Sequence, residues 1–381
     1  MVTQFIQEVR RHYQRPSGAI YLIETAMFGN EHEFINNCLD SRKVSTIGEE
    51  VGQFEETIAR RLGVKYALAT SSGTAALHLG LMAIGVKSRD WVLTSPFTFI
   101  ATSNAILQAG GQPLFIDIER ATLGLSPTKL EEFLVRETYS NSSGHCYHRA
   151  SERRIAACLP IHVFGHPANL PEIDKLCRRY NIPVLEDAAE GLGSSVCGQS
   201  VGTFGDVGVV SFNGNKIITS GGGGMLLTDD ESIYRKAFRR ANQLKSSVNN
   251  DVVEVNYNYR MPALNAALGL AQWQHLDQGI QQKRTLYNWY SNLFSESSIE
   301  VIKEPSESYS NYWLQAIVFS DQQQRDSFVE KTNEAGIETR AAWKLLHRYP
   351  LFNHRFHTPL PNAEWAESCI ANIPSTIMPD A

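Results

Sequence analysis

The feature that most constrains the fold is a regular alternation of short apolar runs and helical patterns between about residue 50 and residue 230. The apolar runs lie at residues 65–70, 91–99, 112–119, 155–162, 182–189 and 207–212. Helical patterns separate them, such as the one that ends on Gly63 and the one that opens on the turn Ser72-Gly73-Thr74. Strands that alternate with helices predict a largely parallel sheet with helices on both faces.

This rhythm is interrupted once and then replaced. Polar, turn-rich residues 140–154 predict a surface hairpin or loop after a capped helix. Beyond about residue 255, a long helical stretch at 263–294, a strand at 312–319 and a helix at 325–336 predict a smaller α+β domain. We therefore expect a large α/β domain at residues 1–250 and a small domain at residues 251–381, with the N-terminal segment packed on the small domain.

Charge and cysteine content exclude several classes of protein. A net charge of −5 at pH 7 argues against nucleic-acid binding and against a polybasic membrane anchor. No run approaches the roughly 18 apolar residues of a membrane helix, and the first residues lack the apolar core of a signal peptide. Six scattered cysteines predict reduced thiols, and no clustered Cys/His pattern indicates a metal. We expect a cytoplasmic protein without a metal, a nucleic-acid partner or a membrane partner.

Chemically unusual residues follow the predicted strands, which is where ligands bind in parallel α/β sheets. The turn Ser72-Gly73-Thr74 follows the first run, where backbone N–H groups at a helix start can hold a phosphate. More often, such a turn only caps its helix. Asp187 and Glu190 follow a later run. Asp187 could also be a simple cap, but a partly buried carboxylate there would need a cationic partner.

Lys216 lies between two further apolar runs and is followed by four glycines, Gly221 to Gly224. A lone lysine usually points to solvent, and a glycine run is usually a flexible turn. Together they indicate a lysine held against a cavity whose backbone is too closely packed for side chains. A lysine removed from water is suited to Schiff-base formation.

These positions together match the needs of pyridoxal 5'-phosphate (PLP). PLP requires a lysine for the Schiff base, a carboxylate that keeps the pyridine nitrogen protonated, and a phosphate cradle. Lys216 and Asp187 supply the first two groups, and Ser211 with the Ser-Gly-Thr turn can supply the third. The combination is far more specific than any of its parts, and it predicts a PLP enzyme that forms pyridoxamine phosphate during turnover.

An ordered series of segments across residues 20–375 resembles the PLP-dependent sugar aminotransferases of the DegT/DnrJ/EryC1/StrS family. The segments are SSGTAALHL, FTFIATSNAI, PIHVFGHPA, LEDAAEGLGS, SFNGNKIITSGGGG and YNYRMPALNAALG. The resemblance implies an α/β protein of aminotransferase fold type I, with a mainly parallel seven-stranded sheet in the large domain. NGNKIIT, ATLGL and TRAAWKLLH look most like the branch that acts on UDP-linked 4-keto-6-deoxy-N-acetylhexosamines, in bacillosamine and legionaminic-acid pathways.

The resemblance also implies roles for the residues around the cofactor ring. Lys216 would bond the cofactor and then move the proton between the cofactor and C4 of the sugar. Asp187 would pair with the pyridine nitrogen, and Glu190 would lie near the ring hydroxyl, where relatives often carry glutamine. Phe99 would stack on the ring, although an aromatic in such a segment is more often part of the core.

Further matched positions concern the phosphate, the partner subunit and the sugar. Gly73, Thr74 and Ser211 would bind the phosphate of this subunit. Asn258 would reach the phosphate of a neighbouring subunit, which implies a homodimer with shared active sites. The resemblance implies that Trp343 and His347 contact the substrate. Taken in isolation, residues of these types more often have a structural role.

This chain also departs from the family pattern. Ser95-Pro96 reverses the Pro-Ser order of many relatives, and glycine fills all four positions where many have Gly-Glu-Gly-Gly. Neither change removes a catalytic group. The retained Lys216 excludes the family's dehydratase offshoot, which carries histidine there.

The implied reaction moves an amino group from L-glutamate to C4 of a nucleotide-linked 4-keto-6-deoxy sugar, for bacterial surface glycans such as lipopolysaccharide. The preferred sugar is UDP-2-acetamido-2,6-dideoxy-4-keto-hexose, and a GDP- or dTDP-4-keto-6-deoxy sugar, as for perosamine, is the alternative. A PLP lyase or an amino-acid transaminase on the same fold stays open. A non-catalytic regulator that binds PLP or a sugar nucleotide also stays open, although the presence of both Lys216 and Asp187 counts against it.

Overall fold

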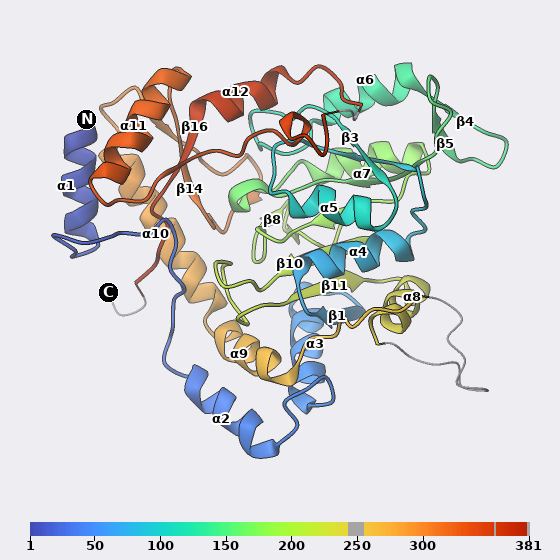
Figure 1. Cartoon of the computed structure of the whole chain (residues 1–381), viewed down its shortest axis with the longest axis horizontal. Helices are drawn as coiled ribbons and strands as arrows, with labels where there is room; N and C mark the ends of the chain where they lie inside the picture. Colours follow the sequence, from blue (N-terminus) through green and yellow to red (C-terminus); the bar gives the residue numbers. More distant parts are fainter. Residues whose placement is uncertain (243–254, 354–355, 379–381) are drawn as a thin grey trace.

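The computed structural model describes residues 1–242, 255–353 and 356–378. In this part of the chain, a central sheet has the strand order β3-β2-β6-β7-β10-β11-β1 (Figure 1). Parallel bridges from Cys158 to Val184 and from Ile161 to Asp187 join its two halves. The strands are β1 Tyr66–Thr70, β2 Trp91–Thr94, β3 Gln112–Phe115, β6 Ile155–Leu159, β7 Leu185–Asp187, β10 Val207–Ser211 and β11 Gly224–Thr228.

The pairing confirms the prediction of a mainly parallel seven-stranded sheet. Strands β2, β3, β6, β7 and β10 pair in parallel, whereas β11 is antiparallel to both of its neighbours, β1 and β10. The six apolar runs of the sequence all contain strands of this sheet. The seventh strand, β11, begins at Gly224, at the end of the glycine run.

Helices cover both faces of the sheet, so successive side chains of one strand enter different cores. On one face, Leu68 and Leu226 pack in a cluster with residues of α4 (Gly73–Ala83), α5 (Ala101–Gln108) and α8 (Glu231–Ala241). On the other face, Ala67 and Leu227 pack with α3 (Glu49–Leu62) and α9 (Ala263–Trp273). Toward β3, that second face is covered by α6 (Pro127–Glu137) and α7 (Leu170–Arg179).

Two small β elements extend from this body. The hairpin predicted at residues 140–154 is present as β4 (Thr138–Ser140) and β5 (Cys146–His148), and it projects from the right-hand end of the molecule (Figure 1). A second element, of order β13-β8-β9, joins β8 (Ser195–Val196) and β9 (Gln199–Ser200) to the distant β13 (Ser308–Tyr309). It therefore ties the turn after β7 to the chain that enters the C-terminal sheet.

The C-terminal part forms an antiparallel sheet of order β12-β14-β16-β15. Its strands are β12 (Glu300–Val301), β14 (Gln315–Val318), β16 (Ile370–Ile373) and β15 (Arg340–Ala341). The helices of this part are α10 (Leu276–Leu293), α11 (Gln322–Glu334) and α12 (Pro361–Cys369). The first helix, α1 (Val2–His12), also packs here, where Phe5 and Val9 share a core with Tyr290, Phe328 and Ile373.

The long helical stretch predicted at 263–294 is two helices, which separate at Gln274 and His275. Helix α9 packs on α2 (Glu31–Ser41) and α3, whereas α10 runs into the C-terminal part. The different packing partners of the two helices give the physical reason for the break. The predicted domain boundary at residues 250/251 lies outside the described residues.

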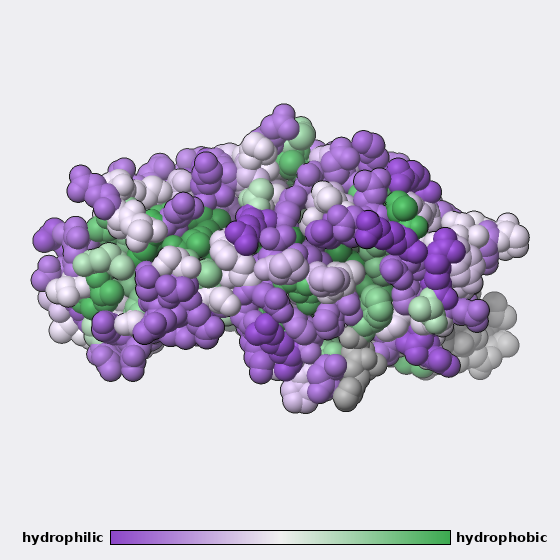
Figure 2. Space-filling model, turned by 90° about the horizontal axis from the view of Figure 1, so that it is seen from above, coloured by the Kyte–Doolittle hydropathy of each residue, from purple (hydrophilic) through white to green (hydrophobic). Residues whose placement is uncertain are grey.

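The surface is predominantly hydrophilic where it is seen from above, over α11, α12 and α6 (Figure 2). In the described part of the chain, no helix is both long enough and apolar enough to cross a membrane. All six cysteines are free thiols, and only Cys197 is exposed.

Candidate active site

A cavity of about 930 Å³ lies beyond the carboxyl ends of β1, β7 and β10. Its floor is formed by the turn before α4, the residues after β2, and the ends of β7 and β10. Its opposite wall comes from the C-terminal part, through Trp313, Arg340 and Trp343. The cavity thus stands where ligands bind in open parallel sheets.

One end of the cavity is suited to a phosphate. Helix α4 begins at Gly73, and its cap Ser72 accepts a hydrogen bond at Oγ from Ala75 N at 3.1 Å. A Cβ atom at Gly73 would lie 3.0 Å from Cβ of Ser211, and one at Gly224 would lie 2.6 Å from Cα of Gly73. The glycines therefore let β10, β11 and the helix start converge, which leaves the backbone N–H groups and the Ser211 hydroxyl beside open space.

Asp187 is the last residue of β7, and its carboxylate lies buried at the cavity wall. Oδ2 accepts a hydrogen bond from Thr102 Oγ1 at 2.7 Å, and Oδ1 accepts one from Ala189 N at 3.2 Å. Burial raises the pKa of Asp187 above its ordinary value, against the effect of these hydrogen bonds. A buried, oriented carboxylate of this kind favours the approach of a cation.

Lys216 follows β10 in the turn that leads to the glycine run. Its Nζ lies 3.7 Å from Oε1 of Glu190. Glu190 also accepts a hydrogen bond at Oε2 from Phe164 N at 2.9 Å. Burial raises the pKa of Glu190 to about 7 even though the charge of Lys216 lowers it, so at neutral pH this carboxyl is partly protonated.

A tryptophan lies over the lysine, and the sequence did not predict it. Lys216 Nζ lies 4.0 Å from the ring centroid of Trp313, a cation–π distance. The indole Nε1 of Trp313 donates a hydrogen bond to Asn215 O at 2.5 Å, which fixes the ring beside the lysine turn. Nothing near Trp313 in the sequence marks it, because it precedes β14 in a segment that reads as an ordinary buried strand.

The other predicted cofactor residues are divided between two places. Thr74 and Phe99 line the cavity, and the Phe99 side chain is 58% exposed, which is unusual for an aromatic residue at the cavity wall. Asn258 is exposed, and its backbone bridges Asn242 rather than lining the cavity of its own chain. A role for Asn258 in this protein thus requires a second subunit, and it stays a prediction.

The two predicted substrate residues also differ in position. Trp343 lines the cavity and packs against Phe164, with ring centroids 4.8 Å apart. His347 lies behind the wall against His357, with ring centroids 4.8 Å apart, whereas its neighbour Leu346 lines the cavity. Burial, with the charge of His357, lowers the pKa of His347 to about 4, so its ring is neutral at pH 7. The sugar-pocket role of both residues stays a prediction.

Two further cationic residues of the wall were missed by the sequence reasoning. Arg340 pairs with Glu338 through Nε at 3.0 Å, and Glu338 is itself held by Leu22 N at 2.9 Å. Lys344 lies over the ring of Tyr349. Both cations line the cavity and are suited to anionic parts of a substrate. The segment TRAAWKLLH contained them, but its pattern did not show which side chains face inward.

Glu186 illustrates a carboxylate with a structural role. It lies next to Asp187 in β7, yet its oxygens accept hydrogen bonds from the backbone N–H groups of Gly202, Phe204 and Gly205. Its side chain is thus consumed in holding the turn before β10. Within the described residues, no group of three or more His, Cys, Asp or Glu side chains is arranged to hold a metal ion.

The residues of the cavity fit PLP. The converging glycines and Ser211 leave room for a phosphate, the buried carboxylate of Asp187 is suited to a protonated ring nitrogen, and Phe99 presents an open ring face. The Lys216 amine lies in the same cavity, with Glu190 and Trp313 around it. These are the groups that PLP requires.

Comparisons with known proteins agree with this chemistry. A sequence profile of the DegT/DnrJ/EryC1/StrS aminotransferase family matches residues 27–378. EpsN of Bacillus subtilis, named as a pyridoxal phosphate-dependent aminotransferase, is 38% identical over 88% of this chain and 84% of its own length. GDP-perosamine synthase of Escherichia coli O157:H7 is 32% identical over 93% of this chain and 94% of its own length.

A solved structure extends the similarity to three dimensions. NtdA of Bacillus subtilis, with the cofactor PMP bound, superposes with a TM-score of 0.78 at 26% identity, over 94% of this chain and 81% of its own. The similarity covers both parts of the molecule, so the cavity walls described above belong to a shared architecture.

Proposed function

Because this chain belongs to the DegT/DnrJ/EryC1/StrS aminotransferase family, we propose that it transfers an amino group from L-glutamate to C4 of a nucleotide-linked 4-keto-6-deoxy sugar. It is a PLP-dependent sugar aminotransferase, an enzyme class that follows from the family. The observation that carries the proposal is the Lys216 amine, which lies in one cavity with the buried carboxylates of Asp187 and Glu190. A non-catalytic regulator would not need this arrangement.

Within this class we favour a GDP-linked sugar. GDP-perosamine synthase of Escherichia coli O157:H7, whose name specifies its product, matches nearly the whole chain. The UDP-linked, N-acetylated sugar is the second candidate, because the segments NGNKIIT, ATLGL and TRAAWKLLH resemble that branch. In either case Arg340 and Lys344 are placed to attract the anionic parts of a nucleotide sugar or of glutamate.

PLP supplies an electron sink for the carbanion that forms when a proton leaves the amino-bearing carbon. The protein's own groups do the rest. Lys216 takes and returns that proton, since its amine projects into the cavity. Asp187, oriented by Thr102, would hold the cofactor through its pyridine nitrogen and keep that nitrogen protonated. The partly protonated Glu190 donates a hydrogen bond in the place where relatives carry glutamine.

The partners in this proposal are the nucleotide-linked keto sugar, L-glutamate and a second copy of the chain. Asn258 supports the homodimer, since it is exposed and lies away from the cavity of its own chain. A cytoplasmic location stays a prediction.

The class of reaction is tested with the purified, PLP-loaded protein. We expect a visible absorption band that L-glutamate bleaches and 2-oxoglutarate restores. Lys216→Ala should lose both the band and turnover. Normal transamination by Lys216→Ala would overturn the central assignment.

The sugar is tested with a panel of GDP-, UDP- and dTDP-linked 4-keto-6-deoxy sugars, using kcat/KM as the measure. We expect the GDP-linked sugar to exceed the others by at least about tenfold, a difference of about 1.4 kcal/mol. A clear preference for the UDP-linked N-acetylated sugar would favour the second candidate. Inactivity on every sugar, combined with activity on 2-oxo acids, would refute the sugar proposal.

A further inference from the structure

The Lys216 amine is held between two groups that come from distant parts of the chain. Glu190 follows β7 in the large sheet and lies 3.7 Å from Nζ, whereas Trp313 precedes β14 and lies 4.0 Å from it. Both a carboxylate and an aromatic face attract an ammonium group. A residue that fixes the positions of Glu190 and Trp313 relative to each other therefore also fixes the position of the free amine.

A single buried side chain connects them. Asn311 Nδ2 donates hydrogen bonds to the backbone oxygens of Glu190 at 2.8 Å and Leu192 at 2.9 Å. Its Oδ1 accepts a hydrogen bond from Trp313 N at 2.8 Å. The Asn311 carboxamide thus uses both of its ends, one on each of the segments that flank the lysine, and it is fully buried.

We propose that Asn311 is a positioning residue of the transamination, which holds both Glu190 and Trp313 beside the Lys216 amine. The proposal deepens the function proposed above and rests on it. Asn311 does not line the cavity and acts only through the two residues that it holds.

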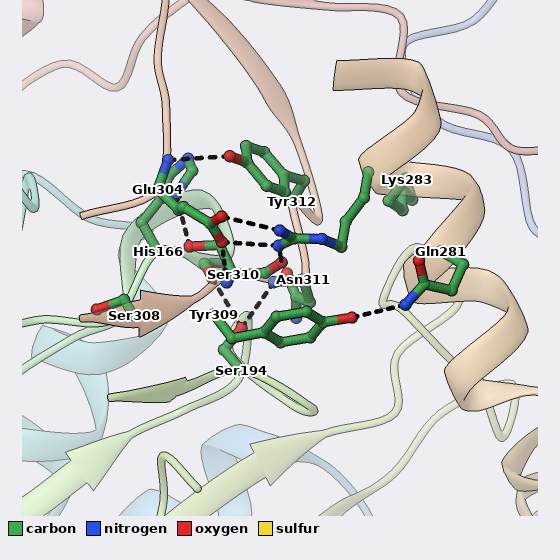
Figure 3. Close-up of polar contacts among 12 residues, drawn as sticks. His166, Ser194, Gln281, Lys283, Glu304, Ser308, Tyr309, Ser310, Asn311 and Tyr312 are labelled. Atoms are coloured by element: carbon green, nitrogen blue, oxygen red, sulfur yellow. Dashed lines mark hydrogen bonds and ion pairs between the residues drawn. The ribbon is translucent and has the colours of Figure 1, made fainter. Parts of the chain in front are cut away.

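The structure reserves the space for this carboxamide. Gly165 has a φ of +94°, and a Cβ atom there would lie 1.9 Å from Asn311 Oδ1, so only glycine fits. Ser194 Oγ donates to Gly165 O at 2.8 Å and accepts from Asn311 N at 2.9 Å. The segments that contain Gly165, Ser194 and Trp313 therefore converge on Asn311. Ser194 and Ser310 lie beside Asn311 in the close-up (Figure 3).

A polar cluster behind Asn311 fixes the segment that carries it (Figure 3). Glu304 accepts from Arg284 at 2.7 and 2.8 Å and from Ser310 N at 2.9 Å. Arg284 in turn donates to Ser310 O at 2.9 Å, and His166 contacts Ser310 Oγ at 3.0 Å. Residue 310 is thus bound through its N–H, its carbonyl and its hydroxyl.

The other side of Asn311 is fixed as well. Lys283 Nζ, fully buried, donates to Trp313 O at 2.9 Å and to Ser375 O. The backbone on both sides of Asn311 is therefore tied down, which makes its side chain a rigid spacer. Rigid support matters here, since a displacement of about 1 Å at a reacting group can lower a rate about 100-fold.

The proposal has a consequence for protonation as well as for geometry. Lys216 faces the carboxylates of Glu190 and Asp187 and the ring of Trp313. If Asn311 no longer held its two neighbours in place, the contacts of Lys216 with Glu190 and with Trp313 would weaken together. The remaining charged side chains of the cavity wall come from other segments, which Asn311 does not hold: Glu338, Arg340 and Lys344.

The test uses the PLP-loaded full chain with Asn311→Ala. Without any substrate, we expect the pH midpoint of the visible cofactor band to move by about half a unit or more. In the half-reaction with L-glutamate, we expect the rate to fall about 10- to 100-fold, while the donor concentration at half-saturation changes less than about threefold. An unchanged midpoint and an unchanged rate would overturn the proposal.

A matched variant separates positioning from stability. Thr332→Val, in α11 and away from the cavity, also removes a buried hydrogen-bonding group, the hydroxyl that bonds Phe328 O at 2.9 Å and Thr339 Oγ1 at 2.6 Å. We expect it to lower the melting temperature without moving the band. If Thr332→Val moved the band as Asn311→Ala does, the effect would be one of stability and the proposal would fail.

Trp313 supplies the decisive comparison and a substitute if Asn311→Ala does not fold. Trp313→Phe keeps a ring face and should leave the midpoint near that of the wild type, whereas Trp313→Leu should move it as Asn311→Ala does. The double variant Asn311→Ala/Trp313→Leu should be little worse than either single one, and fully additive effects would contradict a shared action. The band titration needs no sugar or donor, so a failure of the proposed substrate leaves this test intact.

Discussion

Replacement of Glu190 by glutamine should stabilise the cofactor-free protein at alkaline pH. Glu190 is buried, and burial raises its pKa from an ordinary value of 4.5 to about 7, although Lys216 Nζ lies only 3.7 Å away. The folded protein therefore holds this proton more tightly than the unfolded chain does. Glutamine has nearly the same shape and never takes a charge.

The direction and size of the effect follow from linkage. Below pH 4.5 the carboxyl is protonated in both states, so it imposes no penalty on folding. Between pH 4.5 and 7 the unfolded chain releases the proton first, and stability falls as the pH rises. Above pH 7 the full penalty is present, and at 1.36 kcal/mol per pKa unit it amounts to about 3 kcal/mol.

The assay is chemical unfolding of the cofactor-free protein at pH 5 and pH 8, followed by tryptophan fluorescence. Glu190→Gln should exceed the wild type by less than about 1 kcal/mol at pH 5 and by about 3 kcal/mol at pH 8. Glu304→Gln is the matched control with the opposite sign. Burial raises the pKa of Glu304, but the ion pair with Arg284 and the hydrogen bond from Ser310 N together outweigh it, so the net pKa is lowered.

The control variant should be less stable than the wild type at pH 8, and its deficit should shrink as the pH falls. A Glu190→Gln variant that is less stable than the wild type, with a larger deficit at pH 8 than at pH 5, would refute the reasoning. In that case the Lys216 contact, and not burial, would dominate the environment of Glu190.

Three further experiments probe the cofactor contacts. Asp187→Asn should lower the rate of the reaction with L-glutamate by about 10²-fold or more, measured by stopped-flow bleaching, since a neutral amide cannot stabilise a protonated pyridine; a wild-type rate would exclude the role. Phe99→Ala should weaken PLP binding about tenfold in equilibrium dialysis, as expected for loss of an aromatic face worth about 0.5–1.5 kcal/mol; unchanged affinity would place the ring elsewhere. Refolding inactive Lys216→Ala together with inactive Asn258→Ala should restore part of the activity through mixed dimers, and no recovery would argue against shared sites.

The sequence predicted the large sheet and the ends of its strands well, because both depend on local patterns. Apolar runs of six to nine residues between helices leave little choice of architecture, and Asp187 stands near the point where such a run ends. Lys216 was found in the same way, from the glycines that follow it. These residues lie on one edge of the sheet because parallel strands bring their carboxyl ends together.

Contacts between distant segments left no comparable signal. Trp313 lies over Lys216 only because β14 belongs to a second sheet whose entry passes the cavity, and Asn311 looks like a loop asparagine until its three backbone partners are seen. Lys283 is a similar case, since a lysine in an amphipathic helix is expected in solvent but is buried here between two carbonyls. No glycine or proline marks the break at His275. The helix divides there because its two halves pack against different partners, which the local sequence does not show.

The packing of α1 has a consequence for the order of events during synthesis. Phe5 and Val9 share a core with Ala371 and Ile373, which follow them by more than 360 residues in the chain. The large sheet, complete at Thr228, can form while the residues after it are still being translated. Until Ala371 and Ile373 have been made, the apolar face of α1 lacks that part of its core. The packing of α1 on the C-terminal part is therefore expected to be a late step of folding.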